Sequence, residues 1–325
     1  MDLYDSWSDS AASLLKACAD ADAIIIGSYF PDAIAATREV LDAGFGPLIF
    51  YDIDTPITMS QLRACGRTDY LESAMIPHYA AYLSFTGGPV LRELEDRFGS
   101  PNAVPFYCSV DPELHRPLPS CKNYLCDLSY LGTYAADRQA KLTRFISGTA
   151  ALLPESRFLV AGPQYPSEVA WGPNVDRIIH VSPCDHPAFY SSSRFTLNLT
   201  RADMVAAGYS PSVRLFEASA CGAAILSDAW DGLDEFLTPG EEVLLPHDEY
   251  EAASILKYCS EQERTRLGQR ARERILSEHT ACHRAVQFEN VVEQCYAGWT
   301  DQRRGRSCSE CRHISGDSPL SWVKG

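Results

Sequence analysis

The stretch TLNLTRADMVAAGYSPSVRLFEASACGAAILSD (residues 196–228) decides the fold. It begins with an apolar strand, continues through a polar loop into a helix, and reaches a second apolar strand after Gly222. Strands that are apolar along their whole length and alternate with helices are typical of a parallel sheet covered on both faces. The stretch therefore predicts one strand–helix–strand unit of an α/β domain.

The same alternation continues on both sides of this unit. In the first half the expected strands are residues 23–28, 47–51, 82–85 and 103–107. In the second half they are residues 125–131, 157–161, 177–181, 195–199, 223–227 and 242–245. A proline-rich stretch at residues 111–119 separates the two halves and is typical of a linker. We expect two Rossmann-like parallel-sheet domains, residues 1–115 and 116–300, and a polar flexible tail at residues 301–325.

Composition narrows the class of protein. The chain has 325 residues, of which 46% are hydrophobic and 22% charged, as in a soluble globular protein. Its formal net charge of −15 argues against broad nucleic-acid binding, although a local basic pocket for a phosphate remains compatible with it. No run approaches the roughly 20 apolar residues that span a bilayer, and the acidic start is unlike a signal peptide. We expect a cytoplasmic protein whose 12 scattered cysteines are free thiols.

The helix in the deciding stretch begins with features suited to an anion. Ser210 or Ser212 can cap it, and the proline between them fits a helix start. Unpaired N–H groups and the helix dipole favour a group such as a pyrophosphate there. Arg214 in the first turn and Arg201 in the preceding loop could reach the same anion, or pair with an internal carboxylate instead. Glu217 stands between apolar neighbours, so it either meets ribose hydroxyls or faces solvent.

At this point a family resemblance becomes specific. The run SVRLFEASACGAAILSD (residues 212–228) resembles the donor-site helix of GT-B glycosyltransferases. The wider pattern resembles the CgeB-like glycosyltransferases, which are related in fold to family 4, over about residues 4–295. The blocks that carry it are FYDIDTP (50–56), YLSFTGGP (82–89), YCSVDPELH (107–115), LSYLGTYAADRQ (128–139), VAGPQYP (160–166) and LNLTRADMVAAGYSPSVRLFEA (197–218).

The resemblance implies a GT-B-like fold in which two Rossmann-like domains face each other across a cleft. The N-terminal domain would present the acceptor and the C-terminal domain would hold a nucleotide-sugar donor. The expected function is a bacterial, hexosyltransferase-like enzyme that moves a sugar from a nucleotide-diphosphate sugar to a sugar, lipid, protein or small molecule, without metal or cofactor. Compared with the proteins it resembles, we expect the N-terminal domain to lack its first β/α unit. That difference keeps a second hypothesis open, a non-catalytic nucleotide- or sugar-binding or scaffold protein derived from a transferase.

The resemblance also assigns the donor-binding residues. Glu217 would take the donor ribose, and the amides of Ser210 and Ser212 would meet the diphosphate. Gly132 and Thr133 match the loop that touches donor phosphates.

Four further residues complete the expected site. Arg138 would assist at the phosphates, and Gly162 marks the second strand end of the nucleotide pocket. Arg201 would contribute to donor binding, and Arg214 would stabilise the leaving diphosphate during catalysis. Family 4 enzymes often carry two glutamates eight positions apart, and here the first position is Tyr209, so retention or inversion stays open.

Two patterns in the sequence resemble metal sites. Asp52-x-Asp54 follows a strand, like the metal-binding D-x-D of GT-A glycosyltransferases, but Thr55-Pro56 after it also fits a turn. A third alternative makes Asp54 the catalytic contact to the acceptor. Cys308-x-x-Cys311 with His313 resembles half a zinc site and has no partner pair of matching spacing. We therefore expect no bound metal.

Overall fold

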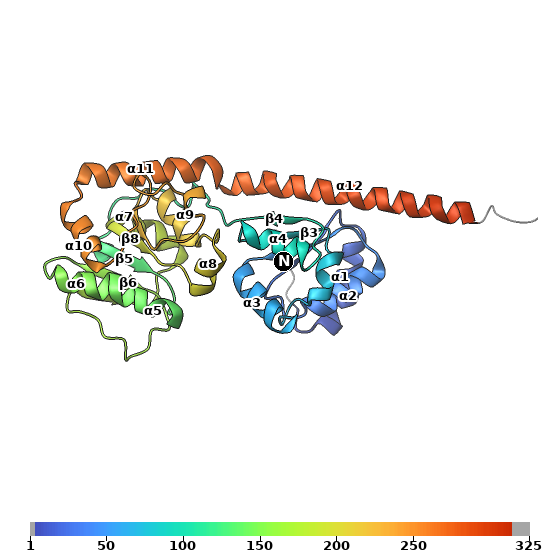
Figure 1. Cartoon of the computed structure of the whole chain (residues 1–325), viewed down its shortest axis with the longest axis horizontal. Coiled ribbons are helices and arrows are strands. Elements are labelled where there is room, and N and C mark those ends of the chain that lie inside the picture. The colour runs from blue at the N-terminus through green and yellow to red at the C-terminus, as the bar shows by residue number, and fades with distance from the viewer. Residues whose placement is uncertain (1–3, 314–325) are drawn as a thin grey trace, which may run out of the picture.

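The chain folds into two α/β domains, each built on a parallel sheet (Figure 1). The computed structural model describes the backbone of residues 4–313 and the side chains of residues 4–301. The sheet of the N-terminal domain has the order β1-β2-β3-β4, and all its described strands are parallel. They are β1 (Ile24–Gly27), β2 (Leu48–Asp52), β3 (Ala81–Ser84) and β4 (Ala103–Pro105). The expectation of a missing β/α unit before β1 stays a prediction.

Helices cover one face of this sheet. They are α1 (Trp7–Ala19), α2 (Ala33–Ala43), α3 (Thr55–Cys65) and α4 (Pro89–Asp96), with a short 3-10 helix at Ser73–His78. The core on this side contains Ile24 and Ile26 of β1 and Phe50 of β2, all buried. Side chains alternate between the two faces of a strand, so Ile49 and Leu83 point to the other face.

The last helix, α12 (Ala281–His313), covers that second face. Its apolar stripe is spaced as one face of a helix and consists of Phe288, Val291, Val292 and Cys295. The stripe packs on Ile49, Ala81 and Leu83, so the helix that follows the C-terminal domain crosses back over the N-terminal one (Figure 1). It thus belongs to the N-terminal core rather than to a domain ending at residue 300. It also continues through residues 301–313, where we expected a tail, and residues 314–325 lie outside the described part.

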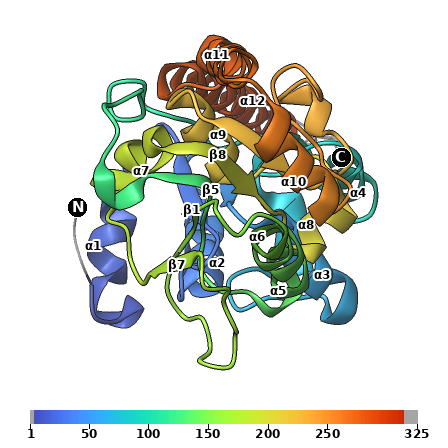
Figure 2. The same cartoon turned by 90° about the vertical axis from the view of Figure 1, so that its left-hand side faces the viewer.

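The C-terminal sheet has the order β7-β6-β5-β8-β9 and is also parallel. Its strands are β5 (Cys126–Leu131), β6 (Phe158–Ala161), β7 (Val175–Ile178), β8 (Ser193–Asn198) and β9 (Ala224–Ser227). One face packs on α7 (His186–Ser192), α9 (Val213–Ala220) and α11 (Glu261–Glu278). The other packs on α5 (Ala136–Leu142), α6 (Thr149–Leu152) and α10 (Glu249–Tyr258), as Figure 2 shows from the end of the molecule.

The chain crosses between the domains twice, and the crossings are paired. Val110 in the first crossing forms a parallel bridge with Thr280 in the second. The amide of Val110 donates to His279 O at 3.0 Å, and the amide of Ala281 donates to Val110 O at 2.8 Å.

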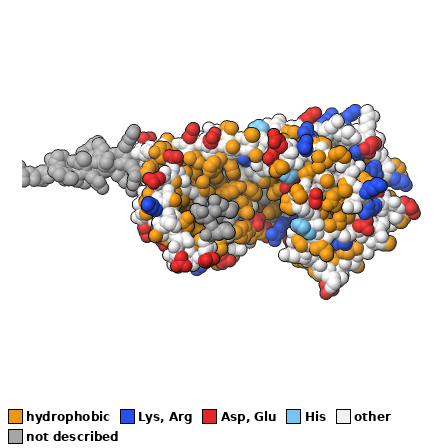
Figure 3. Space-filling model, turned by 180° about the vertical axis from the view of Figure 1, so that it is seen from behind, with side chains coloured by type: hydrophobic (Ala, Val, Ile, Leu, Met, Phe, Trp, Pro, Cys, Tyr) orange, Lys and Arg blue, Asp and Glu red, His pale blue; other side chains and the backbone are white. Residues whose placement is uncertain are grey.

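Seen from behind, the domains form two lobes with a notch between them (Figure 3). The cysteines of the described part are free thiols, and none of its helices is long and apolar enough to cross a bilayer.

Candidate functional site

A pocket of about 510 Å³ opens at the carboxyl edge of the C-terminal sheet. One wall is the loop after β5 and the start of α5, with Thr133, Tyr134 and Arg138. The other wall is the segment after β8, with Arg201 and the start of α8 (Ala202–Ala207). Ligands of open parallel sheets bind at this edge, because the loops there converge from neighbouring strands.

Two arginines of this pocket have unused hydrogen-bonding capacity. Arg138 donates from Nη2 to Thr133 O at 2.8 Å, and Arg201 Nε lies 3.6 Å from Asp137 Oδ2. The Nε atoms of both arginines are buried and have no hydrogen-bond partner among the described residues. A buried N–H of a charged group is costly to leave unpaired. The pair therefore suits an anionic ligand with several oxygens.

Asp137 holds the two walls together. Its Oδ2 accepts a hydrogen bond from the amide of Ala202 at 2.9 Å, and it faces Arg201. Burial opposes ionisation of this carboxyl, but the Ala202 amide and the Arg201 charge lower its pKa overall. Asp137 is therefore a structural carboxylate at physiological pH, and it orients the backbone that carries Arg201.

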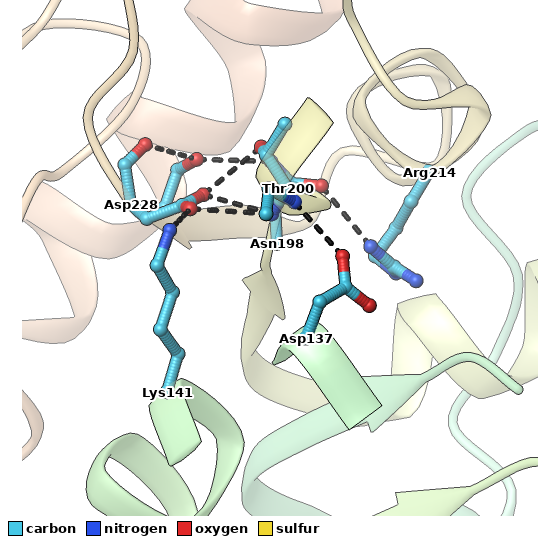
Figure 4. Close-up of polar contacts among 8 residues, drawn as sticks. Asp137, Lys141, Asn198, Thr200, Arg214 and Asp228 are labelled. Carbon is cyan, nitrogen blue, oxygen red and sulfur yellow. Dashed lines mark hydrogen bonds and ion pairs between the residues drawn. The ribbon is translucent and has the colours of Figure 1, made fainter. Parts of the chain in front are cut away.

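A second network of hydrogen bonds holds the segment just before Arg201 (Figure 4). Asp228 follows β9 and is buried, and its Oδ1 accepts hydrogen bonds from Thr200 N at 3.1 Å and Thr200 Oγ1 at 3.0 Å. Lys141 of α5 donates to Asp228 Oδ2 at 2.7 Å. The sequence singled out none of these three residues, since isolated polar residues after strands carry no distinguishing spacing. Together they hold the residue before Arg201 in place.

Arg214 lies in the first turn of α9 and points to the strand ends (Figure 4). It is only 9% exposed, donates from Nε to Leu131 O at 2.7 Å and from Nη1 to Asn198 Oδ1 at 3.1 Å, and lies over the ring of Tyr130. It forms no ion pair within the described part of the chain. Of the two alternatives, internal pairing with a carboxylate does not occur; oxygen atoms of the sheet edge hold the guanidinium instead.

Glycines allow the loops at this edge to approach closely. A Cβ added at Gly132 would lie 2.7 Å from Arg214 Nη2, so Arg214 stacks directly against that loop. A Cβ added at Gly162, whose φ is +140°, would lie 2.1 Å from Gly132 O. Any side chain at Gly162 would therefore displace the loop after β5.

The two serines before α9 are not its side-chain caps. Ser212 is the N-cap residue, but its hydroxyl donates to Asn198 Oδ1 at 2.6 Å rather than capping the helix. Ser210 is buried and its hydroxyl pairs with that of Thr86 in the N-terminal domain at 2.9 Å. The first turn of α9 therefore keeps amide groups available for a ligand.

Glu217, three residues after Arg214 on α9, lies in a cluster with two histidines and a tyrosine. Its Oε2 is 3.3 Å from His186 Nδ1 and 3.4 Å from the Tyr190 hydroxyl, and its Oε1 is 3.6 Å from His115 Nε2. Burial and the Glu217 charge raise the pKa of Tyr190, so this hydroxyl stays protonated. Glu217 therefore does not simply face solvent, and its contact with ribose hydroxyls stays a prediction. Nothing in the sequence linked it to His115 or His186.

The two aspartates after β2 have different surroundings. Asp52 is fully buried and accepts from the Tyr82 hydroxyl at 2.6 Å and from Thr58 Oγ1 at 3.1 Å. Burial raises the pKa of Asp52 in spite of these hydrogen bonds. Asp54 precedes α3 and accepts from the Tyr29 hydroxyl at 2.8 Å. No cluster of three or more His, Cys, Asp or Glu side chains within residues 4–301 could hold a metal, and the Cys308/Cys311 pair lies outside the described side chains.

The architecture is that of the GT-B glycosyltransferases, as comparison with solved structures shows. The Anabaena protein HepE, solved with UDP and glucose, has 12% sequence identity and a TM-score of 0.67, over 90% of this chain and 84% of that one. Sucrose-phosphate synthase from Thermosynechococcus elongatus has 15% identity and a TM-score of 0.64, over 89% and 77%. A glycosyltransferase from Rickettsia africae has 9% identity and a TM-score of 0.64, over 91% and 84%.

Sequence comparison agrees with the structural one. Residues 138–290 match the family model described as glycosyl transferase-like. This match contains the arginines of the pocket and all of α9. No curated protein matches the chain.

Proposed function

We propose that the chain is a glycosyltransferase that moves a sugar from a nucleotide-diphosphate sugar to an acceptor. The observation that carries this proposal is the pocket at the carboxyl edge of the C-terminal sheet, where the buried Nε atoms of Arg138 and Arg201 have no hydrogen-bond partner among the described residues. The GT-B fold and the family match over residues 138–290 support the same function. The CgeB-like branch, a bacterial source and a cytoplasmic location stay predictions from the sequence.

In this proposal the donor diphosphate binds where three positive charges and a helix end converge. Arg138 and Arg201 bind its oxygens, Thr133 and Gly132 lie along it, and Arg214 faces the same loop. The amides at the start of α9, next to Ser212 and Ser210, add partial positive charge. When the bond between the sugar and the diphosphate breaks, negative charge develops on the leaving group. These groups are already oriented and would stabilise that charge.

We further propose that the donor is used without a metal ion. Asp52, the first carboxylate of the D-x-D pattern, has its oxygens engaged by Tyr82 and Thr58 in a fully buried position. A divalent cation would need those oxygens and an open approach. The arginines supply the positive charge instead. Asp54 is proposed as the residue that contacts the acceptor, which is a sugar, lipid, protein or small molecule.

Glu217 is proposed to bind the donor ribose. Its contacts to His186, Tyr190 and His115 are long, between 3.3 and 3.6 Å, so ribose hydroxyls could replace them at little cost. Calorimetry with UDP and 2′-deoxy-UDP tests the assignment. We expect the wild type to prefer UDP by about tenfold, the value of one hydrogen bond to a charged group. The preference should vanish in Glu217→Ala and persist in Glu263→Ala, which removes an exposed carboxylate of α11.

Release of UDP from UDP-glucose tests the transferase itself. We expect slow hydrolysis by the wild type, with water as the acceptor, and loss of this activity in Arg201→Met. A protein that binds UDP with the expected dependence on Arg201 but releases none from UDP-glucose, UDP-galactose or UDP-N-acetylglucosamine would favour the non-catalytic binding protein.

A further inference from the structure

The loop between α8 and α9 carries an aromatic residue that contacts both domains. The ring of Tyr209 lies between Gly88 of the N-terminal domain and Gly232 of its own domain. A Cβ added at Gly88 would lie 2.2 Å from Tyr209 Cδ2, and one added at Gly232 would lie 2.3 Å from Cδ1. Only glycine on both sides admits the ring. The Tyr209 ring is therefore enclosed on two sides, and its packing requires glycine at both positions.

The backbone of the same residue joins the two domains. The amide of Gly87 donates to Tyr209 O at 2.9 Å, and the amide of Tyr209 donates to Asp231 O at 2.6 Å. Tyr209 itself has a φ of +47°, in the left-handed region that costs a non-glycine residue energy. Such strain persists only where surrounding contacts enforce it, and it concentrates at functional sites.

The next residue, Ser210, adds a side-chain contact between the two domains. The hydroxyls of Ser210 and Thr86 are 2.9 Å apart, and both residues are buried. Residues 86–88 directly follow β3, at the carboxyl edge of the N-terminal sheet. Residues 208–212 join α8, which begins after Arg201, to α9. The contact therefore links the carboxyl edge of one sheet to the segment that bears the donor pocket of the other.

This contact lies near the first chain crossing, because a Cβ added at Gly87 would lie 2.0 Å from the hydroxyl of Tyr107, which precedes Val110. The crossings pair Val110 with Thr280, and α12 continues from there over the N-terminal sheet. The covalent connection and α12 join the domains there, and Tyr209 adds a contact through both its side chain and its backbone. Side-chain and backbone contacts outside the covalent crossings restrict the rotation that the crossings alone would allow.

We propose that Tyr209 is a positioning residue, which sets the carboxyl edge of the N-terminal domain against the donor pocket through its ring and its backbone. The inference rests on the proposed function for its effect on sugar transfer, but its effect on domain orientation is independent of that function. Tyr209 acts through the loop it holds and is not assigned a contact with substrate. The ring matters and the hydroxyl does not, because the two glycines contact the ring.

The first experiment measures domain orientation. Spin labels are attached through unnatural amino acids at Lys16 of α1 and Ser254 of α10, both exposed, and the distance distribution between them is recorded. We expect the wild type and Tyr209→Phe to give the same narrow distribution. Gly88→Ala and Tyr209→Ala should broaden or shift it. Gly240→Ala is the matched control, because Gly240 has a φ of +81° and an added Cβ there meets no atom within 4 Å.

The second experiment measures function in the same variants. UDP affinity should stay within about threefold of wild type, because the pocket residues are untouched. The turnover number for UDP release from UDP-glucose should fall at least about tenfold in Gly88→Ala and Tyr209→Ala and be restored in Tyr209→Phe, since small misplacement of reacting groups is costly. Circular dichroism confirms that each variant is folded.

Unchanged distance distributions in both Gly88→Ala and Tyr209→Ala overturn the proposal, whatever the activity. Changed distributions with turnover within twofold of wild type overturn the link to transfer. A wild type that binds no UDP contradicts the proposed function instead, and the distance measurement still decides the role of Tyr209.

Discussion

Arg214→Met replaces a buried guanidinium by an apolar side chain of similar length, and its cost can be worked from the structure. Arg214 is 9% exposed and supplies Leu131 O with a charged donor at 2.7 Å. Losing a hydrogen bond from a charged donor to a buried acceptor costs about 1.5–3 kcal/mol. Loss of its position over the Tyr130 ring adds about 1 kcal/mol. Asn198 Oδ1 keeps its bond from Ser212, so we count nothing for it.

The sum is a loss of about 3 kcal/mol in the free energy of unfolding, since the apolar replacement offsets part of it. At about 2–4 °C per kcal/mol for a domain of this size, the unfolding midpoint should fall by about 6–12 °C. The assay is thermal unfolding followed by circular dichroism without ligand. Arg38→Met is the control, because Arg38 forms an exposed ion pair with Glu72 at 2.7 Å and should cost at most about 1 kcal/mol. Equal midpoints for the two variants would refute the reasoning.

Three further predictions follow from other parts of the molecule. Burial, followed by the charge of Arg284, lowers the pKa of His279 from 6.5 to about 4, so folding favours its neutral form. The contribution of His279 to the free energy of unfolding should therefore be full above pH 6.5 and decline as the pH falls toward 4. Urea titrations at each pH should show a weaker decline in His279→Gln, and an equal decline in both proteins would count against this assignment. Gly162→Ala should displace Gly132 and weaken UDP binding at least about tenfold by calorimetry, while Gly240→Ala leaves it unchanged. UDP release from UDP-glucose should be the same with and without EDTA, and abolition by EDTA would contradict a metal-independent pocket.

Local sequence patterns predicted most of the strands in the two sheets. Residues 23–28 were expected to form a strand, and β1 occupies Ile24–Gly27, because a run of β-branched apolar residues next to turn signals is a local property. Residues 242–245 form only two isolated bridges, Leu244 with Leu226 and Val243 with Pro239. An apolar run indicates burial, but it does not say whether a neighbouring strand lies within pairing distance.

Long-range relations could not be predicted in this way. The stripe of α12 shows that the helix buries one face, yet the periodicity is equally compatible with either domain. The contacts of Glu217 with His115 and His186, and of Tyr209 with Gly88, join residues from separate elements. The family resemblance predicts Thr133 and Arg138, and the loop before the deciding helix predicts Arg201. The structure places all three in one pocket. Their assignment to a donor diphosphate stays a proposal.

Calorimetric titration of UDP is the most direct test of that proposal. The wild type is compared with the double variant Arg138→Met/Arg201→Met and with Arg157→Met, whose guanidinium pairs with Asp176 at an exposed site away from the pocket. We expect the wild type to bind UDP, the double variant to bind it at least about 100-fold more weakly, and the control to match the wild type. Equal UDP affinity in the wild type and the double variant, or no binding by the wild type, would contradict a diphosphate site between these two arginines.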